Sequence, residues 1–232
     1  MFRKLTKSLV RTANIVLKPL GHEIRKNYPD VYLHRYESYE HYKRVQVFHN
    51  KRKLGTVWAD KQTLILVAER VTREFGKNGE RPLFGICHEA RNGFEQNCLS
   101  DLLSADIIGT DISDTAAQFP RSVQWDFHDV NPDWLGRCDF VYSNSLDQSW
   151  KPKEAASTWL DQLRLGGLLF IEHSRAHGPE GASEMDPFGV KAEYMPYVLS
   201  EWFGHRISLE ILKGEKANMD MEIWLFVMKR LR

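Results

Sequence analysis

The sequence predicts an α/β fold built on a seven-stranded, mostly parallel sheet with helices on both faces and an antiparallel last strand. Three observations support this prediction. From residue 59 onward, short apolar segments of strand length alternate with amphipathic segments of helix length. Polar and ionisable side chains follow the ends of the short segments, as expected at the carboxyl edge of a parallel sheet. The last two apolar segments are joined by a short polar stretch, which indicates an antiparallel pair.

The elements can be assigned in order from their periodicity and stop signals. The first is a helix over residues 59–75, in which Leu64, Val67 and Val71 share a face and Gly76 follows as a stop. The other expected elements are strand Leu83–Cys87, helix Phe94–Leu103, strand Ile107–Asp111, strand Val123–Phe127, strand Asp139–Ser143, helix Ala155–Arg164, strand Leu168–Glu172, helix Val190–Phe203, and strands Ile207–Leu212 and Ile223–Met228 around the turn Lys213–Asp220.

Length and composition bound the class of protein. The chain has 232 residues, of which 42% are hydrophobic, so a single domain with a real core is expected. A net charge of +1 gives no global signal for nucleic acid. Cys87, Cys98 and Cys138 lack paired or zinc-type spacing, which is typical of reduced cysteines in a cytoplasmic protein. We find no apolar run of the about 18 residues that a membrane span needs, and no signal-peptide pattern.

We divide the chain into an N-terminal appendage, residues 1–55, and a main domain, residues 56–232. Residues 1–26 carry seven basic residues against the single acid Glu23, with apolar residues at helical spacing. This basic amphipathic helix, ended or kinked at Pro19 and Gly21, could contact the inner membrane face peripherally, dock a partner, or pack on its own domain.

Residues 28–55 are rich in Tyr, His, Lys and Arg, which favours a lid or a substrate pocket. Interleaved aromatic and basic residues can also bind nucleic acid, but we do not expect it here because no basic block continues through the chain.

The acid at the end of the second predicted strand, Asp111, is placed to accept hydrogen bonds from both ribose hydroxyls of a nucleoside. Other polar side chains are expected at the same edge: Glu89, Arg91 and Asn92 after the first strand, Asp126, His128 and Asp129 after the third, Ser143, Asn144 and Asp147 after the fourth, and Glu172, His173, Ser174 and His177 after the fifth. This clustering at one edge predicts a ligand site there.

With these pieces in order, residues 60–230 resemble the class I S-adenosylmethionine-dependent methyltransferases, which have a Rossmann-like fold. The resemblance rests on five motifs in the expected order: Gly85-Ile-Cys-His-Glu-Ala-Arg-Asn-Gly93-Phe-Glu, the acid Asp111, Trp125-Asp126-Phe127-His128-Asp129, Asp139-Phe-Val-Tyr-Ser-Asn-Ser-Leu-Asp147, and Leu165-Gly-Gly-Leu-Leu-Phe-Ile-Glu-His173.

The resemblance implies S-adenosyl-L-methionine as cofactor, with Asp126 on the adenine amino group and Asn144 beneath the sulfonium. The implied cofactor-binding residues are Gly85, Glu89, Arg91, Gly93, Asp111, Ile112, Asp126, Phe127 and Asn144. Glu89 replaces the usual central glycine of the first motif. It either marks a degenerate, non-catalytic domain or places a carboxylate toward the methionine ammonium; we favour the second interpretation. NAD is disfavoured because the third glycine of its motif is absent.

Methyl transfer to a hydroxyl requires a base beside the methyl group. His173 and His177 are the candidate catalytic residues, because histidine titrates near neutral pH, and Asp147 is a further base or a residue that orients a histidine. These three could together bind a metal, but no spacing motif demands one, and none is predicted. Glu184 and Asp186 are expected to form part of the acceptor pocket.

The sequence therefore predicts a methyltransferase, EC class 2.1.1, acting on a sugar or another small-molecule hydroxyl. The loops after the fourth and fifth strands resemble a bacterial branch linked to surface-glycan biosynthesis, which implies a glycan or sugar-linked acceptor. Two alternatives stay open: a methyltransferase acting on RNA or protein, motivated by residues 28–55, and a non-catalytic scaffold with the same fold, motivated by Glu89.

Overall fold

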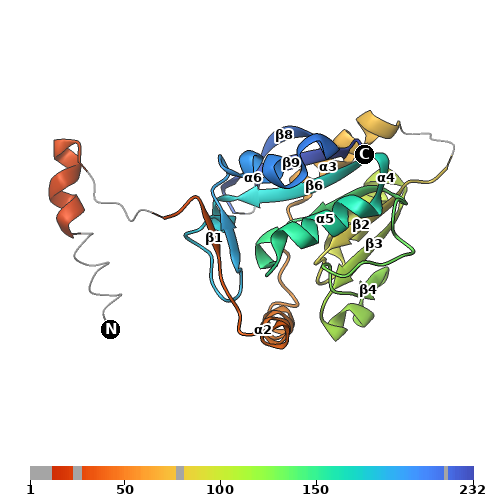
Figure 1. The fold of residues 1–232 in the computed structure, drawn as a ribbon, viewed down its shortest axis with the longest axis horizontal. Helices are drawn as coiled ribbons and strands as arrows, with labels where there is room; N and C mark the ends of the chain where they lie inside the picture. The colour runs from red at the N-terminus through yellow and green to blue at the C-terminus, as the bar shows by residue number, and fades with distance from the viewer. Residues whose placement is uncertain (1–11, 23–27, 77–80, 217–218) are drawn as a thin grey trace.

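The computed structural model describes residues 12–22, 28–76, 81–216 and 219–232, and it confirms the predicted architecture (Figure 1). Within these residues a seven-stranded sheet has the order β4-β3-β2-β5-β6-β9-β8. Its strands are β2 (Phe84–His88), β3 (Asp106–Asp111), β4 (Ser122–Gln124), β5 (Cys138–Ser143), β6 (Leu163–Ser174), β8 (Ile207–Lys216) and β9 (Met221–Arg230). A separate two-stranded sheet pairs β1 (Val31–Leu33) with β7 (Phe188–Val190), and the longer helices are α2 (Tyr39–Arg52), α3 (Lys61–Phe75), α4 (Phe94–Leu103), α5 (Pro152–Gln162) and α6 (Met195–Phe203).

The strand pairing creates a switch point at the centre of the sheet. Strand β2 is parallel to β3 on one side and to β5 on the other, so the chain leaves β2 in one direction and later returns to its opposite edge. Strand β9 is antiparallel to both β6 and β8, as the predicted antiparallel end requires. In sheets of this kind the crevice for a ligand lies beyond the carboxyl ends of the two strands that flank the switch point.

Helices cover both faces of the sheet, and each face has its own apolar core. Trp159 of α5 and Leu199 of α6 are fully buried on one face. Leu64 and Val67 of α3 and Leu99 of α4 are fully buried on the other. Burying one such aliphatic side chain stabilises the fold by roughly 1.5–3 kcal/mol, so the two cores hold the strand ends in fixed positions.

Several predicted element boundaries were wrong. The strand expected over Val123–Phe127 ends at Gln124, because the next carboxylate, Asp126, accepts the backbone N–H of His128 and turns the chain. The helix expected over Ala155–Arg164 begins earlier, at Pro152, since proline is pre-organised for the first turn of a helix.

The helix expected over Val190–Phe203 begins only at Met195. Its expected first residue is instead the last residue of β7, where Val190 pairs with Val31 of β1. The turn expected over Lys213–Asp220 is also shorter than predicted, because β8 continues to Lys216 before β9 begins at Met221.

Part of the predicted N-terminal amphipathic helix, residues 1–11 and 23–27, lies outside the described residues. Residues 12–17 are helical, a 3-10 turn follows at Lys18–Leu20, and Gly21 ends it with a φ of 78°. The apolar side chains of Ile15, Val16 and Leu20 are 73%, 65% and 68% exposed. Contact of this segment with a membrane or a partner stays a prediction. Among the described residues, no helix is both long enough and apolar enough to cross a bilayer.

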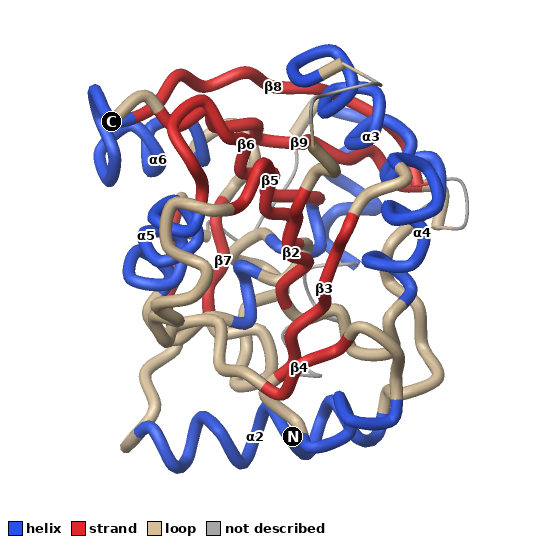
Figure 2. The backbone as a smooth tube through the Cα atoms, turned by 90° about the vertical axis from the view of Figure 1, so that its right-hand side faces the viewer, coloured by secondary structure: helices blue, strands red, loops and turns tan. Residues whose placement is uncertain are grey.

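Helix α2 crosses the edge of the sheet near β4 and the end of β3 (Figure 2). Ser38 caps its first turn by accepting the backbone N–H of His41. Its buried residues are Tyr42, Gln46 and Asn50, which recur at four-residue spacing and therefore share one face. This polar and aromatic face is turned toward the crevice, as the contacts below show.

Candidate functional site

Asp111, the predicted ribose acid, ends β3 at the switch-point edge and is only 2% exposed. Its Oδ1 accepts the backbone N–H of Ser113 at 2.7 Å, and its Oδ2 accepts a hydrogen bond from the side chain of Asn50 in α2. Burial raises the pKa of Asp111 to about 6, although the hydrogen bonds from Ser113 and Asn50 and the charge of Arg91 favour its ionised form.

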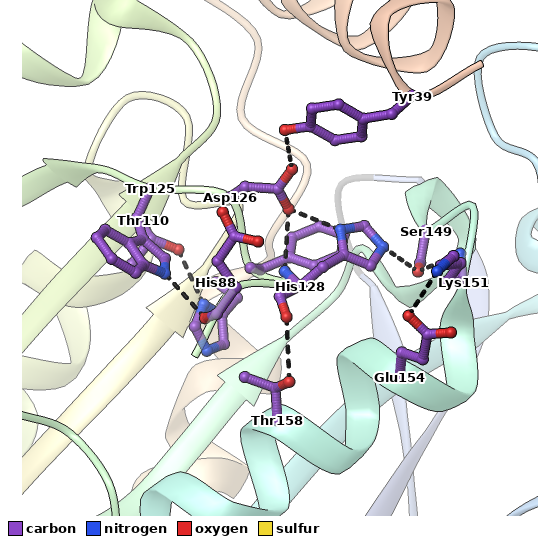
Figure 3. Close-up of polar contacts among 12 residues, drawn as sticks. Tyr39, His88, Thr110, Trp125, Asp126, His128, Ser149, Lys151, Glu154 and Thr158 are labelled. Atoms are coloured by element: carbon purple, nitrogen blue, oxygen red, sulfur yellow. Dashed lines mark hydrogen bonds and ion pairs between the residues drawn. The ribbon is translucent and has the colours of Figure 1, made fainter. Parts of the chain in front are cut away.

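Asp126 lies just beyond β4, and its side chain points toward Tyr39 and His128 (Figure 3). Its Oδ1 accepts the backbone N–H of His128 at 2.9 Å and faces His128 Nδ1 at 2.6 Å, while its Oδ2 accepts the hydroxyl of Tyr39 at 2.8 Å. Burial alone would raise the pKa of this carboxyl, but the hydrogen bonds and charge of His128 hold it below its ordinary value. Asp126 is therefore an ionised acceptor held in a fixed orientation.

His128 continues this chain of contacts to Ser149, whose Oγ lies 2.7 Å from His128 Nε2 (Figure 3). The order serine–histidine–aspartate is that of a hydrolase triad. Ser149, however, has no exposed surface, and its Oγ also accepts the backbone N–H of Lys151. The contacts therefore fix the loop that carries Asp126 and do not present a nucleophile to a substrate.

Glu89 follows β2 and has a φ of +58°, in the left-handed region, at the position where the first motif usually has glycine. Its pKa lies well above the ordinary value, first because it is desolvated and then because Asp111 and Asp126 are close. Arg91 and a hydrogen bond with the Ile112 backbone oppose this shift. Glu89, Asp111 and Asp126 thus form an acid cluster. The charges of Asp111 and Asp126 disfavour the ionised form of Glu89, so a cationic group would bind favourably among the three carboxyl groups.

Gly93 and Asn144 complete the edge of the acid cluster. Gly93 caps α4 with a φ of +82°, a conformation that side chains other than glycine adopt at a cost. Asn144 follows β5 and donates to Glu95 Oε1 at 3.3 Å, so its amide is turned toward the first turn of α4. Both residues lie at the edge where the sequence predicted them.

Two predicted cofactor-binding residues are not brought to the crevice. Gly85 lies near the start of β2, and a Cβ there would come within 2.5 Å of the ring of Phe140, so its small size serves packing. Phe127 is 1% exposed and packs in the core against Trp159, with ring centroids 5.2 Å apart.

A second set of side chains lines a small cavity at the end of β6, here called the acceptor pocket after the role proposed for it below. Glu184 and Asp186, which the sequence predicted there, are not among its lining residues. Its polar wall is formed by Asp147, Glu172, His173 and His177, and its apolar wall by Leu146, Phe188, Val190 and Met195. The three predicted catalytic residues are therefore brought together: the rings of His173 and His177 are 5.3 Å apart, and His177 Nε2 lies 3.8 Å from Asp147 Oδ2. Their catalytic roles stay predictions.

The hydrogen bonds of the two histidines fix which nitrogen holds the proton. His173 Nε2 faces the carbonyl oxygen of Val190 at 2.9 Å, so it carries the proton and Nδ1 keeps its lone pair. His177 Nδ1 accepts the backbone N–H of Ser174, so its Nε2 is the N–H donor. Burial lowers the pKa of His173 to about 4 and that of His177 well below its ordinary value, and burial together with nearby Asp186 raises the pKa of Asp147. Both histidines are consequently uncharged at neutral pH.

Sequence reasoning missed an ion pair behind the acceptor pocket. Lys216 Nζ lies 2.5 Å from Glu172 Oε1, and neither side chain has exposed surface. Lys216 also donates to the carbonyl oxygen of Trp58 at 2.8 Å and lies over its ring, and Glu172 accepts the hydroxyl of Tyr142 at 2.6 Å. Lys216 lies in the stretch that its polar neighbours marked as a turn, so no sequence signal distinguished it from a solvated lysine.

Sequence reasoning also missed Tyr39 and Asn50 as partners of the site acids, although it expected residues 28–55 to include a lid. The available signal was the spacing of Tyr39, Tyr42, Gln46 and Asn50, which places four hydrogen-bonding side chains on one helix face. For metals, the described part of the chain contains no group of three or more His, Cys, Asp or Glu residues that could hold an ion.

Comparison with solved structures supports the fold. A Burkholderia thailandensis 1,6-didemethyltoxoflavin N1-methyltransferase with bound S-adenosylhomocysteine matches 91% of this chain and 99% of its own, with a TM-score of 0.64 and 10% identity. The plantazolicin methyltransferase BpumL in complex with S-adenosylhomocysteine matches 82% of this chain and 95% of its own, with a TM-score of 0.60 and 13% identity.

The fold is that of the class I methyltransferases. It does not by itself establish an activity, since the [4+2]-cyclase SpnF also matches, over 89% of this chain and 99% of its own, with a TM-score of 0.59 and 12% identity. No family model and no curated protein matches the sequence.

Proposed function

We propose that this protein is an S-adenosylmethionine-dependent methyltransferase that acts on a hydroxyl group of a small molecule. The observation that carries the proposal is the acid cluster beside the acceptor pocket. S-adenosylmethionine has a cationic sulfonium and ammonium, two ribose hydroxyls and an adenine amino group, all of which suit carboxylate partners. The raised pKa of Glu89 and Asp111 reflects desolvated acids that such a ligand would stabilise in their ionised form.

Each residue of the cofactor side has a role in this proposal. Asp111 accepts the ribose hydroxyls, Asp126 accepts the adenine amino group, and Glu89 faces the methionine ammonium. Arg91, whose charge already acts on Glu89 and Asp111, pairs with the methionine carboxylate. Asn144 lies between this side and the acceptor pocket. The bound cofactor supplies a methyl group on a good leaving group.

The acceptor pocket supports a hydroxyl acceptor. His173 is uncharged and carries its proton on Nε2. Its Nδ1 therefore has a lone pair that can accept a hydroxyl proton. The Nε2–H of His177 can donate to the same substrate and orient it. The cavity, about 10 Å³, has room for about one water molecule, so it would hold the reacting hydroxyl and not a whole acceptor. A sugar hydroxyl is the acceptor we propose to test first.

Calorimetric titration with S-adenosylmethionine and S-adenosylhomocysteine tests the cofactor assignment. Asp111→Asn keeps the size of the side chain but removes the charge that would accept both hydroxyls, so we expect about hundredfold weaker binding. Asp106→Asn is the matched control, because Asp106 is an exposed acid at the other end of the same strand.

Equal affinity in the two variants would contradict the role of Asp111. The absence of binding to the folded wild-type protein would contradict the enzyme proposal and favour a non-catalytic scaffold, for which the strained Glu89 in a glycine position is the specific observation.

A further inference from the structure

We propose that α2 is a lid latched over the acid cluster by Asn50 and Tyr39, so that a nucleoside reaches Asp111 and Asp126 only when these two hydrogen bonds release. The inference rests on the proposed function and adds to it a gate that controls cofactor entry. It places two residues of α2, neither of them in a recognised motif, in direct competition with the cofactor.

The contacts of α2 carry the first step. Near one end of the helix, Tyr39 donates to Asp126 Oδ2 at 2.8 Å, and near the other, Asn50 donates to Asp111 Oδ2. Asp111 and Asp126 are only 2% and 9% exposed. Ribose hydroxyls and an adenine amino group are also hydrogen-bond donors, so a nucleoside needs the same carboxylate oxygens and the space that α2 covers.

The character of the interface carries the second step. The buried residues of α2 are Tyr42, Gln46 and Asn50, and none is aliphatic. Tyr42 is 1% exposed and its ring stacks on Trp150, whereas Gln46 and Asn50 are held by hydrogen bonds, which a ligand or water can replace when α2 opens. Opening of α2 therefore releases the two hydrogen bonds to the site acids, which the cofactor can replace, and also separates the ring of Tyr42 from Trp150.

The lid is also connected to the acceptor side. Gln46 donates to the carbonyl oxygen of Met185 at 3.1 Å, and His41 Nε2 lies 2.9 Å from Glu184 Oε1. The same stretch of chain continues to Phe188, which lines the acceptor pocket. Movement of α2 consequently releases the loop 183–187, which couples cofactor entry to the shape of the acceptor pocket.

The test compares binding kinetics of S-adenosylhomocysteine by stopped-flow tryptophan fluorescence. Trp150 stacks on Tyr42 of α2, with ring centroids 5.7 Å apart and an interplanar angle of 19°, so it reports the position of the lid. The latch variants are Tyr39→Phe, which removes one hydroxyl, and Asn50→Asp, which replaces the donor with a second carboxylate of the same size. Arg44→Ala is the control, since Arg44 is an exposed side chain of the same helix.

We expect association about tenfold faster in each latch variant and unchanged in Arg44→Ala, because the open fraction of the lid rises. In the wild type, the observed rate should reach a plateau with increasing S-adenosylhomocysteine, as a gated site requires. A rate that rises linearly with the same slope in all four proteins would overturn the lid. Loss of the signal in Trp150→Phe identifies its source.

Hydrogen exchange of the α2 amides, measured with no added ligand, gives a second and independent readout. Both latch variants should exchange faster than the wild type and Arg44→Ala. If S-adenosylhomocysteine binds at equilibrium while rates and exchange are unchanged in the latch variants, the lid is wrong and the proposed function stands. If the folded wild type binds no S-adenosylhomocysteine, the proposed function fails, and the gate fails with it.

Discussion

Asp111 should cost the folded protein stability, and Asp111→Asn should therefore be more stable than the wild type above pH 6. The pKa of this buried carboxyl rises from 3.8 to about 6 on folding. Stability from a group with a raised pKa is fully present below pH 3.8 and is lost as pH rises through about 6. Two pKa units at about 1.4 kcal/mol each make this loss about 3 kcal/mol at neutral pH.

An asparagine has only one acceptor oxygen, so one of the hydrogen bonds from Ser113 and Asn50 is lost, which costs the variant about 1–2 kcal/mol. The net gain for Asp111→Asn is thus about 1–2 kcal/mol at pH 7.5. For a chain of 232 residues this corresponds to roughly 2–8 °C in Tm. At pH 5 the loss in the wild type is only about half as large, so the gain should shrink.

Urea unfolding of the wild type, Asp111→Asn and the exposed-acid control Asp106→Asn at pH 5 and pH 7.5 measures this directly. The reasoning is refuted if Asp111→Asn is less stable than the wild type at pH 7.5, or if its difference from the wild type is the same at both pH values. Confirmation would show that the site acid is kept at the expense of stability.

Two further predictions concern buried charges, one behind the acceptor pocket and one at the start of β5, at the opposite edge of the sheet. Lys216→Met should destabilise the fold by about 3–5 kcal/mol in urea unfolding, because it leaves Glu172 buried without its ammonium partner. The double variant Lys216→Met with Glu172→Gln should recover most of this loss. Equal losses in the single and double variants would contradict the prediction. Asp139 is buried, but hydrogen bonds from Arg81, Phe84 and Arg164 hold its pKa below 3.8. Asp139→Asn should cost about 2 kcal/mol at pH 7, and the cost should begin to shrink only as pH falls below about 3.8. A cost independent of pH would exclude the ion pairs as its source.

The residues that the sequence placed well are those at strand ends. Asp111, Asn144 and His173 follow buried apolar segments, and parallel pairing brings the carboxyl ends of such segments to one edge whatever the details of the loops. Phe127 was misplaced because the strand before it ends at Gln124, and the turn at Asp126 directs the ring into the core. The strand ends three residues earlier than predicted, and the alternation of apolar and polar residues over so short a strand does not reveal where it ends.

The residues that the sequence did not reveal act across long separations. Asn50 and Asp111 are 61 positions apart, and Tyr39 and Asp126 are 87 apart. Pattern analysis detects apolar faces, whereas the contact face of α2 is polar and resembles a solvated one. Lys216 was hidden for a related reason, since only the fold shows that this lysine is buried against Glu172.

The pairing of β1 with β7 has a consequence for the order in which the molecule folds. Val31 and Val190 are neighbours in this small sheet, so the chain between them must close a loop of about 160 residues before the pair can form. The parallel strands β2, β3 and β5 require much shorter closures. The sheet can therefore assemble first, while the segment that carries α2 is synthesised early and docks late. Until α2 docks, the carboxyl groups of the crevice are exposed to solvent. Helix α2 then covers them on a core that has already formed.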